Sequence, residues 1–180
     1  MLDLVEQDLI LAKAKKLRLL ILDVDGVLTD GKLFFDEHGK EYKSFHARDG
    51  HGIKLLQQTG VKVAVISGRK SVSVALRMQS LGVELVYQGY DNKLSAFDEL
   101  CDQLSLTADQ IAHVGDDVLD LPLMIRVGLA IAVQDAHESV KRHAHWCTRL
   151  NGGYGAVREV CDLIMTAQGT LDHVIESYLT

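Results

Sequence analysis

Two acidic residues directly follow an apolar run close to the start of this 180-residue chain. Asp23 and Asp25 stand at the end of residues 17–22, which have the composition of a buried strand. An ionised carboxylate that loses water is costly unless a partner compensates its charge, and side chains two residues apart on an extended chain point to the same face. The pair can therefore share a cation, or divide the roles of nucleophile and proton donor. A plain turn is the alternative, because Asp and Gly are common in turns for conformational reasons alone.

Composition restricts the classes of protein to which the chain can belong. Hydrophobic residues make up 47% of the 180, which suits a single domain, 1–180, with its own core. The net charge of −6 argues against a nucleic-acid partner, since binding to phosphate backbones needs clustered Lys and Arg. The apolar runs are shorter than the ~20 residues of a membrane span, and the first residues are acidic where a secretory signal is basic. We therefore expect a cytoplasmic protein with no membrane partner, whose three cysteines are reduced packing residues.

Short apolar stretches alternate with amphipathic ones along the chain. In residues 94–104, for example, apolar side chains recur three or four positions apart, as on one face of a helix. Strands that alternate with helices predict an α/β fold built on a doubly wound parallel sheet. The five expected strands are residues 17–22, 61–66, 84–87, 111–114 and 129–133.

Three segments depart from this alternation. Residues 32–45 predict a projecting β-hairpin, with its turn at residues 36–39. Residues 154–180 are expected to form a helix followed by a polar tail that is either a last helix or mobile. Near the N-terminus, a stripe of apolar residues is expected to serve core packing or a subunit contact: Leu4, Val5, Leu9 and Ala12.

Polar residues also follow other predicted strands. Ligands of open parallel sheets bind beyond the carboxyl ends of the strands, and there the chain places Ser67, Lys93 and Asp116. With Asp117 and Asp120, five carboxylates would crowd one edge and repel one another unless a divalent cation neutralises them. Oxygen ligands without His or Cys favour Mg²⁺ over Zn²⁺. Together with a hydroxyl and a lysine, the set predicts Mg²⁺-dependent phosphoryl transfer.

These motifs resemble, in order and spacing, those of the haloacid dehalogenase-like phosphatases. The sequence DVDGV at residues 23–27 looks like the first motif, Ser67 the second, Lys93 the third, and GDDVLD at residues 115–120 the fourth. The resemblance implies a Rossmann-like fold in which Ser67 and Lys93 bind phosphate. The spacing between the motifs leaves no room for a cap domain.

The same resemblance implies roles for the carboxylates. Asp23 would attack phosphorus and form an aspartyl phosphate, while Asp25 would protonate the leaving alcohol and then activate the hydrolytic water. Mg²⁺ would be held by Asp23, the backbone carbonyl of Asp25, and Asp116. For Asp117 and Asp120 the alternatives of an outer-sphere residue and a helix N-terminal residue stay open.

A closer resemblance covers residues 17–170. Segments such as VDGVLTDG (24–31), FHARDG (45–50), SGRK (67–70) and GGYGAVREVCDLI (152–164) are similar to those of the 3-deoxy-D-manno-octulosonate 8-phosphate phosphatase family. That family implies a cytoplasmic, Mg²⁺-dependent homotetramer of lipopolysaccharide biosynthesis, whose subunits complete one another's active sites. The alternatives are a phosphatase of a nine-carbon 3-deoxy-nonulosonate 9-phosphate and a non-catalytic assembly module.

A sugar acid with a carboxylate and a phosphate needs cations beyond Lys93. Arg69, directly after the expected phosphate site, is the strongest candidate, and Arg77 the weakest, because its helix also suits a solvated face. Tyr154 stands where many relatives carry a basic residue. The residues expected to bind substrate are His46, Ala47, Arg48, Asp49, Gly50, Lys54, Arg69 and Arg77.

The segment His143-Ala144-His145-Trp146-Cys147 resembles a metal-binding run. Alternation along a short strand explains it more simply, because no fourth ligand is placed by the sequence.

Overall fold

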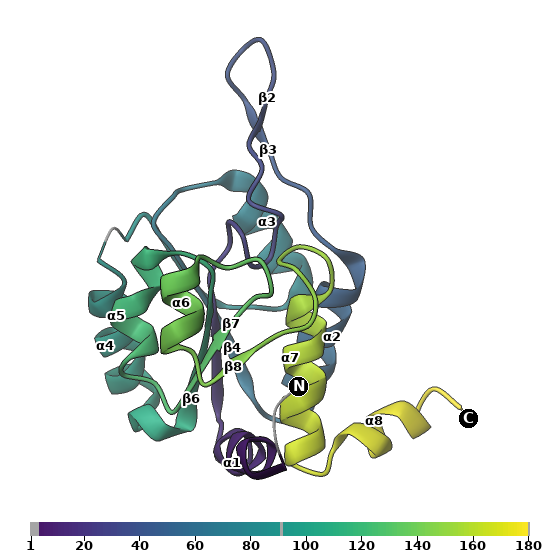
Figure 1. The fold of residues 1–180 in the computed structure, drawn as a ribbon. Coiled ribbons are helices and arrows are strands. Elements are labelled where there is room, and N and C mark those ends of the chain that lie inside the picture. Colours follow the sequence, from purple (N-terminus) through teal and green to yellow (C-terminus); the bar gives the residue numbers. More distant parts are fainter. Residues whose placement is uncertain (1–3, 91, 180) are drawn as a thin grey trace.

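The computed structural model describes residues 4–90 and 92–179, and its centre is a six-stranded sheet (Figure 1). The strand order is β5-β4-β1-β6-β7-β8, and every neighbouring pair is parallel. This confirms the predicted doubly wound α/β fold. The strands are β1 (Leu19–Leu22), β4 (Lys62–Ser67), β5 (Leu85–Gln88), β6 (Ile111–Gly115), β7 (Leu129–Ala132) and β8 (Trp146–Cys147).

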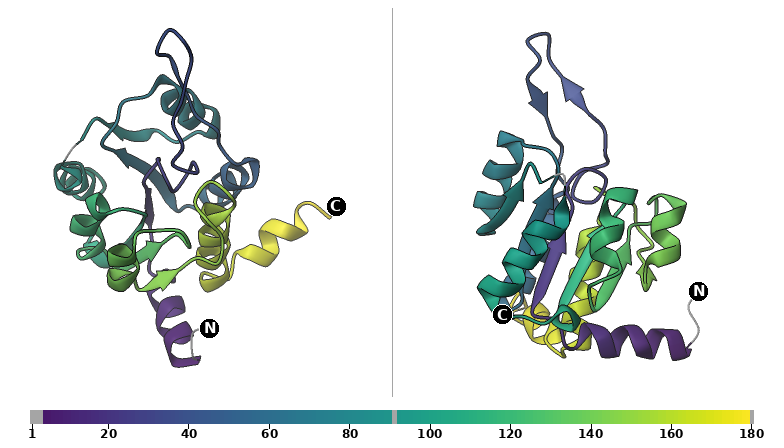
Figure 2. Two further views of the ribbon diagram at one scale, coloured as in Figure 1. Left: turned by 45° about the horizontal axis from the view of Figure 1, so that its top comes forward. Right: turned by 90° about the vertical axis from the view of Figure 1, so that its left-hand side faces the viewer.

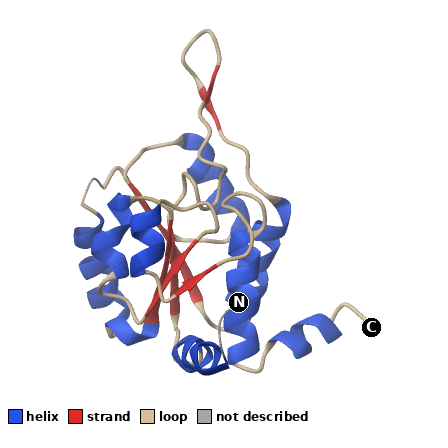
Figure 3. Ribbon diagram, in the orientation of Figure 1, coloured by secondary structure: helices blue, strands red, loops and turns tan. Residues whose placement is uncertain are grey.

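Helices cover both faces of this sheet, which is why its central strands are apolar throughout (Figure 3). Helices α4, α5 and α6 lie on one face, and α2 and α7 lie together on the other, with α3 beside α2. Their bounds are α2 (Ala47–Gln58), α3 (Val72–Leu81), α4 (Lys93–Leu104), α5 (Leu121–Met124), α6 (Glu138–His143) and α7 (Ala156–Ala167), with single turns η1 (Ala108–Gln110) and η2 (Val118–Asp120).

The register of the central strands sets the position of the first acidic pair. Leu22, the last residue of β1, lies between Val65 of β4 and Val114 of β6. The chain segments that leave these three strands therefore emerge side by side. Asp23 follows at once, and its backbone N–H donates to the carbonyl of Val114 at 3.1 Å.

The predicted hairpin is present and stands away from the body of the molecule in each view (Figure 2). Its strands, β2 (Phe34–Phe35) and β3 (Glu41–Tyr42), pair antiparallel, and Phe34, Phe35 and Tyr42 are exposed. Between β1 and β4 the chain contains only this hairpin and α2, and between β4 and β5 only α3. Neither of these two connections contains a cap domain, as the motif spacing predicts.

The two ends of the described chain are helical. In α1 (Leu4–Ala14) the buried side chains are Ile10 and Ala14, one turn apart, and this helix packs on α7. The core-packing prediction for the N-terminal stripe is therefore wrong, since Leu4, Val5, Leu9 and Ala12 are exposed. A subunit contact for the stripe stays a prediction.

At the other end, the polar tail contains α8 (Leu171–Glu176), which extends beyond the body of the molecule (Figure 1). The three cysteines are unpaired, as predicted. Within residues 4–90 and 92–179, we find no helix with the length and apolar character to cross a membrane.

Candidate active site

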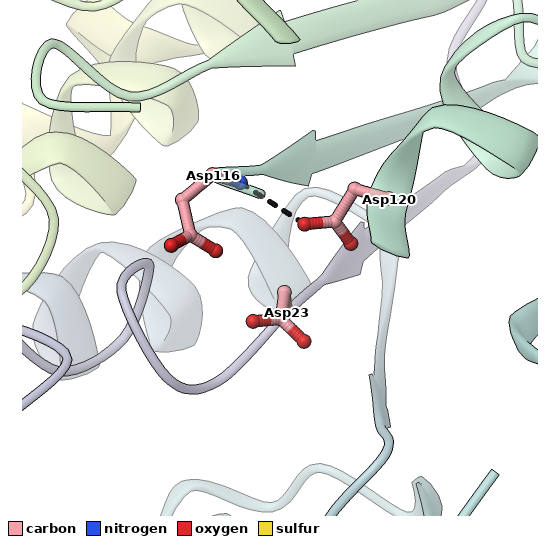
Figure 4. A group of neighbouring side chains, drawn as sticks. All are labelled: Asp23, Asp116 and Asp120. Atoms are coloured by element: carbon pink, nitrogen blue, oxygen red, sulfur yellow. Dashed lines mark hydrogen bonds between the residues drawn. The ribbon is translucent and has the colours of Figure 1, made fainter. Parts of the chain in front are cut away.

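Three carboxylates that follow two neighbouring strands lie close together (Figure 4). Asp23 follows β1, Asp116 follows β6, and Asp120 closes the turn η2. One oxygen from each of the three lies within 4.8 Å of the others, and the described part of the chain holds this one cluster of metal-ligating side chains. The structure thus joins two of the predicted metal ligands, Asp23 and Asp116, although 93 positions separate them in the sequence.

The electrostatics of this cluster call for a cation. Burial raises the pKa of Asp23 to about 6, although Lys93 opposes the rise. Burial, and next the negative charges of Asp23 and Asp120, raise the pKa of Asp116 to about 8. A divalent cation among these oxygens would remove the repulsion and stabilise the ionised forms. The all-oxygen donor set therefore fits Mg²⁺.

The protein itself contributes one buried cation to this cluster, the side chain of Lys93. It begins α4, where the side chain of Asn92 caps the helix by accepting from the Leu94 N–H at 3.1 Å. Its Nζ donates to Asp23 Oδ1 at 2.5 Å and to Asp120 Oδ1 at 2.6 Å. Burial favours the neutral amine, but the charges of Asp23 and Asp120 outweigh it and raise the pKa of Lys93. The lysine therefore stays an ammonium.

The structure decides between the alternatives for Asp120 and Asp117. Asp120 Oδ2 accepts from the backbone N–H groups of Asp116 and Asp117, at 3.0 and 3.3 Å, while Oδ1 accepts from Lys93 and lies 2.9 Å from His113 Nε2. With both oxygens in use, Asp120 orients its neighbours rather than binding metal. Asp117 is the helix N-terminal residue, since its carboxylate accepts from the Val118 N–H at 2.7 Å.

A second group of charges surrounds Asp25. Lys43 Nζ donates to Asp25 Oδ1 and lies 3.0 Å from Glu41 Oε1, with only 1% of its side chain exposed. Arg69 donates to Glu41 Oε2 and places its Nε 3.8 Å from Asp25 Oδ2. The sequence motifs did not point to Glu41, Lys43 or His113. The first two stand in the hairpin and the third in an apolar strand, so no local pattern distinguishes them.

The predicted phosphate ligand Ser67 is buried at the end of β4, the strand next to β1. Its Oγ accepts from the backbone N–H of Arg69 at 3.2 Å, which holds the turn that carries this arginine. A role in phosphate binding stays a prediction for Ser67.

The predicted substrate residues of the HARDG segment (residues 46–50), together with Lys54, divide into exposed and buried ones. His46 stands at the N-cap position of α2 without a capping hydrogen bond from its side chain. Ala47 and Arg48 are exposed in the first turn of this helix, as is Lys54 further along. Asp49 is buried instead, and its carboxylate accepts from the backbone N–H groups of Gly155 at 3.2 Å and Arg158 at 2.7 Å.

Gly50 and Arg77 lie in the contact between α2 and α3. A Cβ added at Gly50 would lie 2.1 Å from Arg77 Nη2, so the glycine makes room for the guanidinium. In this chain Asp49, Gly50 and Arg77 therefore serve contacts between elements. A direct contact with substrate stays a prediction for them.

A glycine-rich loop supports the segment that carries the acidic pair. Gly153 N–H donates to the carbonyl of Val27 at 2.9 Å, and a Cβ at Gly152 would lie 1.6 Å from the carbonyl oxygen of Gly26. Tyr154 donates from its hydroxyl to Asp30 Oδ2 at 3.4 Å, with its ring half exposed. The close backbone approach explains the need for glycine at position 152.

A cavity of about 990 Å³ lies elsewhere, among α1, β8 and α7. Arg48, Trp146, Tyr154 and Arg158 are among its lining residues, and none of the clustered carboxylates is.

The segment at 143–147 forms no metal site, because His145 Nδ1 accepts from the Ala130 N–H and the described part of the chain holds no His or Cys cluster. The short strand that we expected there is the edge strand β8.

Comparisons with known proteins agree with this geometry. A family model described as haloacid dehalogenase-like hydrolase matches residues 83–160. The 3-deoxy-D-manno-octulosonate 8-phosphate phosphatase KdsC of Escherichia coli (strain K12) is 49% identical over 163 residues, which are 91% of this chain and 87% of that protein.

Two solved structures of similar proteins contain bound metals, and one of them also contains phosphate and KDO. That of the 3-deoxy-D-manno-octulosonate 8-phosphate phosphatase from Moraxella catarrhalis, in complex with magnesium ion, phosphate ion and KDO, has a TM-score of 0.92, 38% identity, and coverage of 94% of this chain and 97% of its own. The cobalt-bound deoxy-D-mannose-octulosonate 8-phosphate phosphatase from Haemophilus influenzae has a TM-score of 0.89, 41% identity, and coverage of 93% and 99%.

Gly26 offers a test of the metal site. Its φ is +98°, and an added Cβ would lie 2.0 Å from Asp116 Oδ2. We expect Gly26→Ala to lower the affinity for Mg²⁺ by about tenfold or more, as displacement of a metal ligand does. Gly31→Ala is the matched control, since Gly31 also has positive φ (+72°) but no atom closer than 3.6 Å to the added Cβ. Equal Mg²⁺ affinities of the two variants in calorimetric titrations would contradict the assignment.

The buried carboxylate of Asp49 predicts a loss of stability. Asp49→Ala leaves the N–H groups of Gly155 and Arg158 without their acceptor, so we expect the free energy of unfolding to fall by about 1–3 kcal/mol. Lys54→Ala, on the exposed face of the same helix, should change it by less than about 0.5 kcal/mol. Urea titrations at one protein concentration measure both values, and equal losses would show that Asp49 does not anchor α7.

Proposed function

The chain belongs to the haloacid dehalogenase-like hydrolases and, within them, to the 3-deoxy-D-manno-octulosonate 8-phosphate phosphatase family, and we propose that it releases phosphate from 3-deoxy-D-manno-octulosonate 8-phosphate. The products are 3-deoxy-D-manno-octulosonate and inorganic phosphate, and the pathway is lipopolysaccharide biosynthesis. One observation carries the proposal: Asp23, Asp116 and Lys93 converge at the carboxyl end of the sheet, in a chain that is 49% identical to a phosphatase of this name.

Asp23 is the nucleophile in the proposed reaction. Its carboxylate forms a bond to phosphorus as the bond from phosphorus to the sugar oxygen breaks, which produces an aspartyl phosphate. Lys93 Nζ, 2.5 Å from Asp23 Oδ1, lies where it can offset the negative charge of the phosphoryl group. Ser67 and Lys93 bind the phosphate.

Asp25 moves the protons. Its carboxyl group protonates the leaving sugar oxygen, and the resulting carboxylate then takes a proton from the water that attacks phosphorus and releases Asp23. Lys43 holds Oδ1 of Asp25, whereas Oδ2 is buried and has no hydrogen bond from the described protein atoms. We therefore assign the proton transfer to Oδ2.

A divalent cation, which we propose to be Mg²⁺, would be held by Asp23, Asp116 and the backbone carbonyl of Asp25. When bound, it supplies positive charge that neutralises the phosphoryl oxygens. The oxygen-only donor set favours Mg²⁺ over softer metals such as cobalt.

We further propose a single domain over residues 1–180 that acts in the cytoplasm as a homotetramer. The exposed aromatic side chains of the hairpin support a subunit contact, because large apolar groups gathered at one projection are typical of interfaces. Neighbouring subunits would then cover the open site. Among the substrate candidates, Arg69 has the strongest support, since it lies beside the proton donor Asp25.

A phosphate-release assay over several sugar phosphates, with and without Mg²⁺, tests the reaction and the substrate together. We expect release only with Mg²⁺, and a kcat/KM for the eight-carbon 8-phosphate at least about tenfold above that for a nine-carbon 3-deoxy-nonulosonate 9-phosphate. Equal values would contradict the eight-carbon assignment. Release from no substrate would favour the non-catalytic assembly module.

The nucleophile has its own test. Asp23→Asn should abolish phosphate release while circular dichroism shows an intact fold, because the amide cannot attack phosphorus. Asp98→Asn, on the exposed face of α4, is the control and should retain the activity of the unchanged protein. An Asp23→Asn variant that turns over substrate would require another nucleophile.

A further inference from the structure

His113 is a buried histidine with no part in the reaction described above. It lies in β6 among the buried apolar residues of that strand and is fully enclosed. Its Nε2 is 2.9 Å from Asp120 Oδ1, and its Nδ1 is 3.3 Å from the carbonyl oxygen of Ile21 in β1. A buried polar ring that reaches the site from within the sheet calls for an explanation.

The partners of the ring decide which of its nitrogens carry hydrogen. Nδ1 faces the carbonyl oxygen of Ile21 at 3.3 Å, the longer of the two contacts. Asp120 accepts three other hydrogen bonds, from Lys93 and two backbone N–H groups, and such a carboxylate is held in its ionised form. Nε2, 2.9 Å from this carboxylate, therefore donates to Asp120 Oδ1.

We propose that His113 is a positioning residue of the phosphatase site, which acts through Asp120. The inference rests on the proposed function. The hydrogen bond from His113 keeps Asp120 Oδ1 in place, and Asp120 in turn orients Lys93 and the turn that presents Asp116. None of these contacts involves substrate directly.

The sharing of Lys93 explains why Asp120 needs a second partner at this position. Lys93 is shared between Asp23 and Asp120, so a single ammonium faces two buried carboxylates. The hydrogen bond from His113 Nε2, at 2.9 Å, gives Asp120 Oδ1 a second partner, which it keeps when Lys93 turns toward a phosphoryl group. A phenyl ring would fill a similar volume but would donate no hydrogen bond, so packing alone does not account for a histidine.

Two amide variants separate the two hydrogen bonds of the ring. The amide nitrogen of Asn is two bonds from Cβ, like Nδ1 of His, and that of Gln is three bonds from Cβ, like Nε2. His113→Gln can therefore keep the donor to Asp120, whereas His113→Asn can keep only the donor to Ile21. His113→Phe keeps neither.

We expect His113→Asn and His113→Phe to lower kcat by about 10- to 100-fold, the range found when the support of a site residue is removed. His113→Gln should stay within about fivefold of the unchanged protein, because the amide can still donate to the carboxylate of Asp120. KM should change less than kcat, since His113 does not touch substrate. Melting temperatures of all three variants monitor the fold. Equal kcat losses in the Asn and Gln variants, or full activity in the Phe variant, would overturn the proposal.

A measurement on the unchanged protein does not depend on turnover. In NMR spectra of protein with ¹⁵N-labelled histidine, assigned by comparison with His113→Gln, Nε2 of His113 should carry hydrogen, because it donates to Asp120. An Nε2 without hydrogen would overturn the proposal, even if the variants fail to fold. Failure of the proposed function is recognised separately, because the unchanged protein would then release no phosphate from any sugar phosphate tested.

Discussion

The buried ammonium of Lys93 is the contact on which the arrangement of the site depends. It joins Asp23 at the end of β1 to Asp120 beyond the end of β6, at 2.5 and 2.6 Å. Either carboxylate would be strongly unfavourable at the mouth of an apolar sheet without this partner. Asp116 receives no such contact from Lys93, so its negative charge beside Asp23 and Asp120 is left for a divalent cation to offset.

The surrounding fold keeps these charges in place through backbone contacts. The loop after β1 passes so close to the glycine-rich loop that no side chain fits at Gly152. That loop leads into α7, whose first N–H groups are bound by Asp49 of α2. The HARDG segment therefore supports the site indirectly, through the anchoring of a helix, in addition to the substrate contacts that the family resemblance predicts for its exposed residues.

The hairpin contacts the proposed proton donor Asp25 at one end and exposes aromatic side chains at the other. Its inner end brings Glu41 and Lys43 to Asp25 and Arg69, while its strands expose Phe34 and Phe35 to the outside. A partner that covers the exposed aromatic side chains would therefore contact the same hairpin whose Lys43 binds Asp25. This arrangement suits a site without a cap domain and agrees with our proposal that a neighbouring subunit encloses the substrate.

The sequence by itself determined the parallel sheet, the hairpin and the identity of the acidic cluster, because these follow from local patterns of apolar residues and from short motifs at strand ends. Only the tertiary structure decided that Asp120 orients rather than ligates, that Asp49 anchors α7, and that Lys43 and His113 belong to the site. The reason is physical: the role of a charged side chain depends on which partners reach its atoms, and those partners come from strands and helices that lie far apart in the sequence.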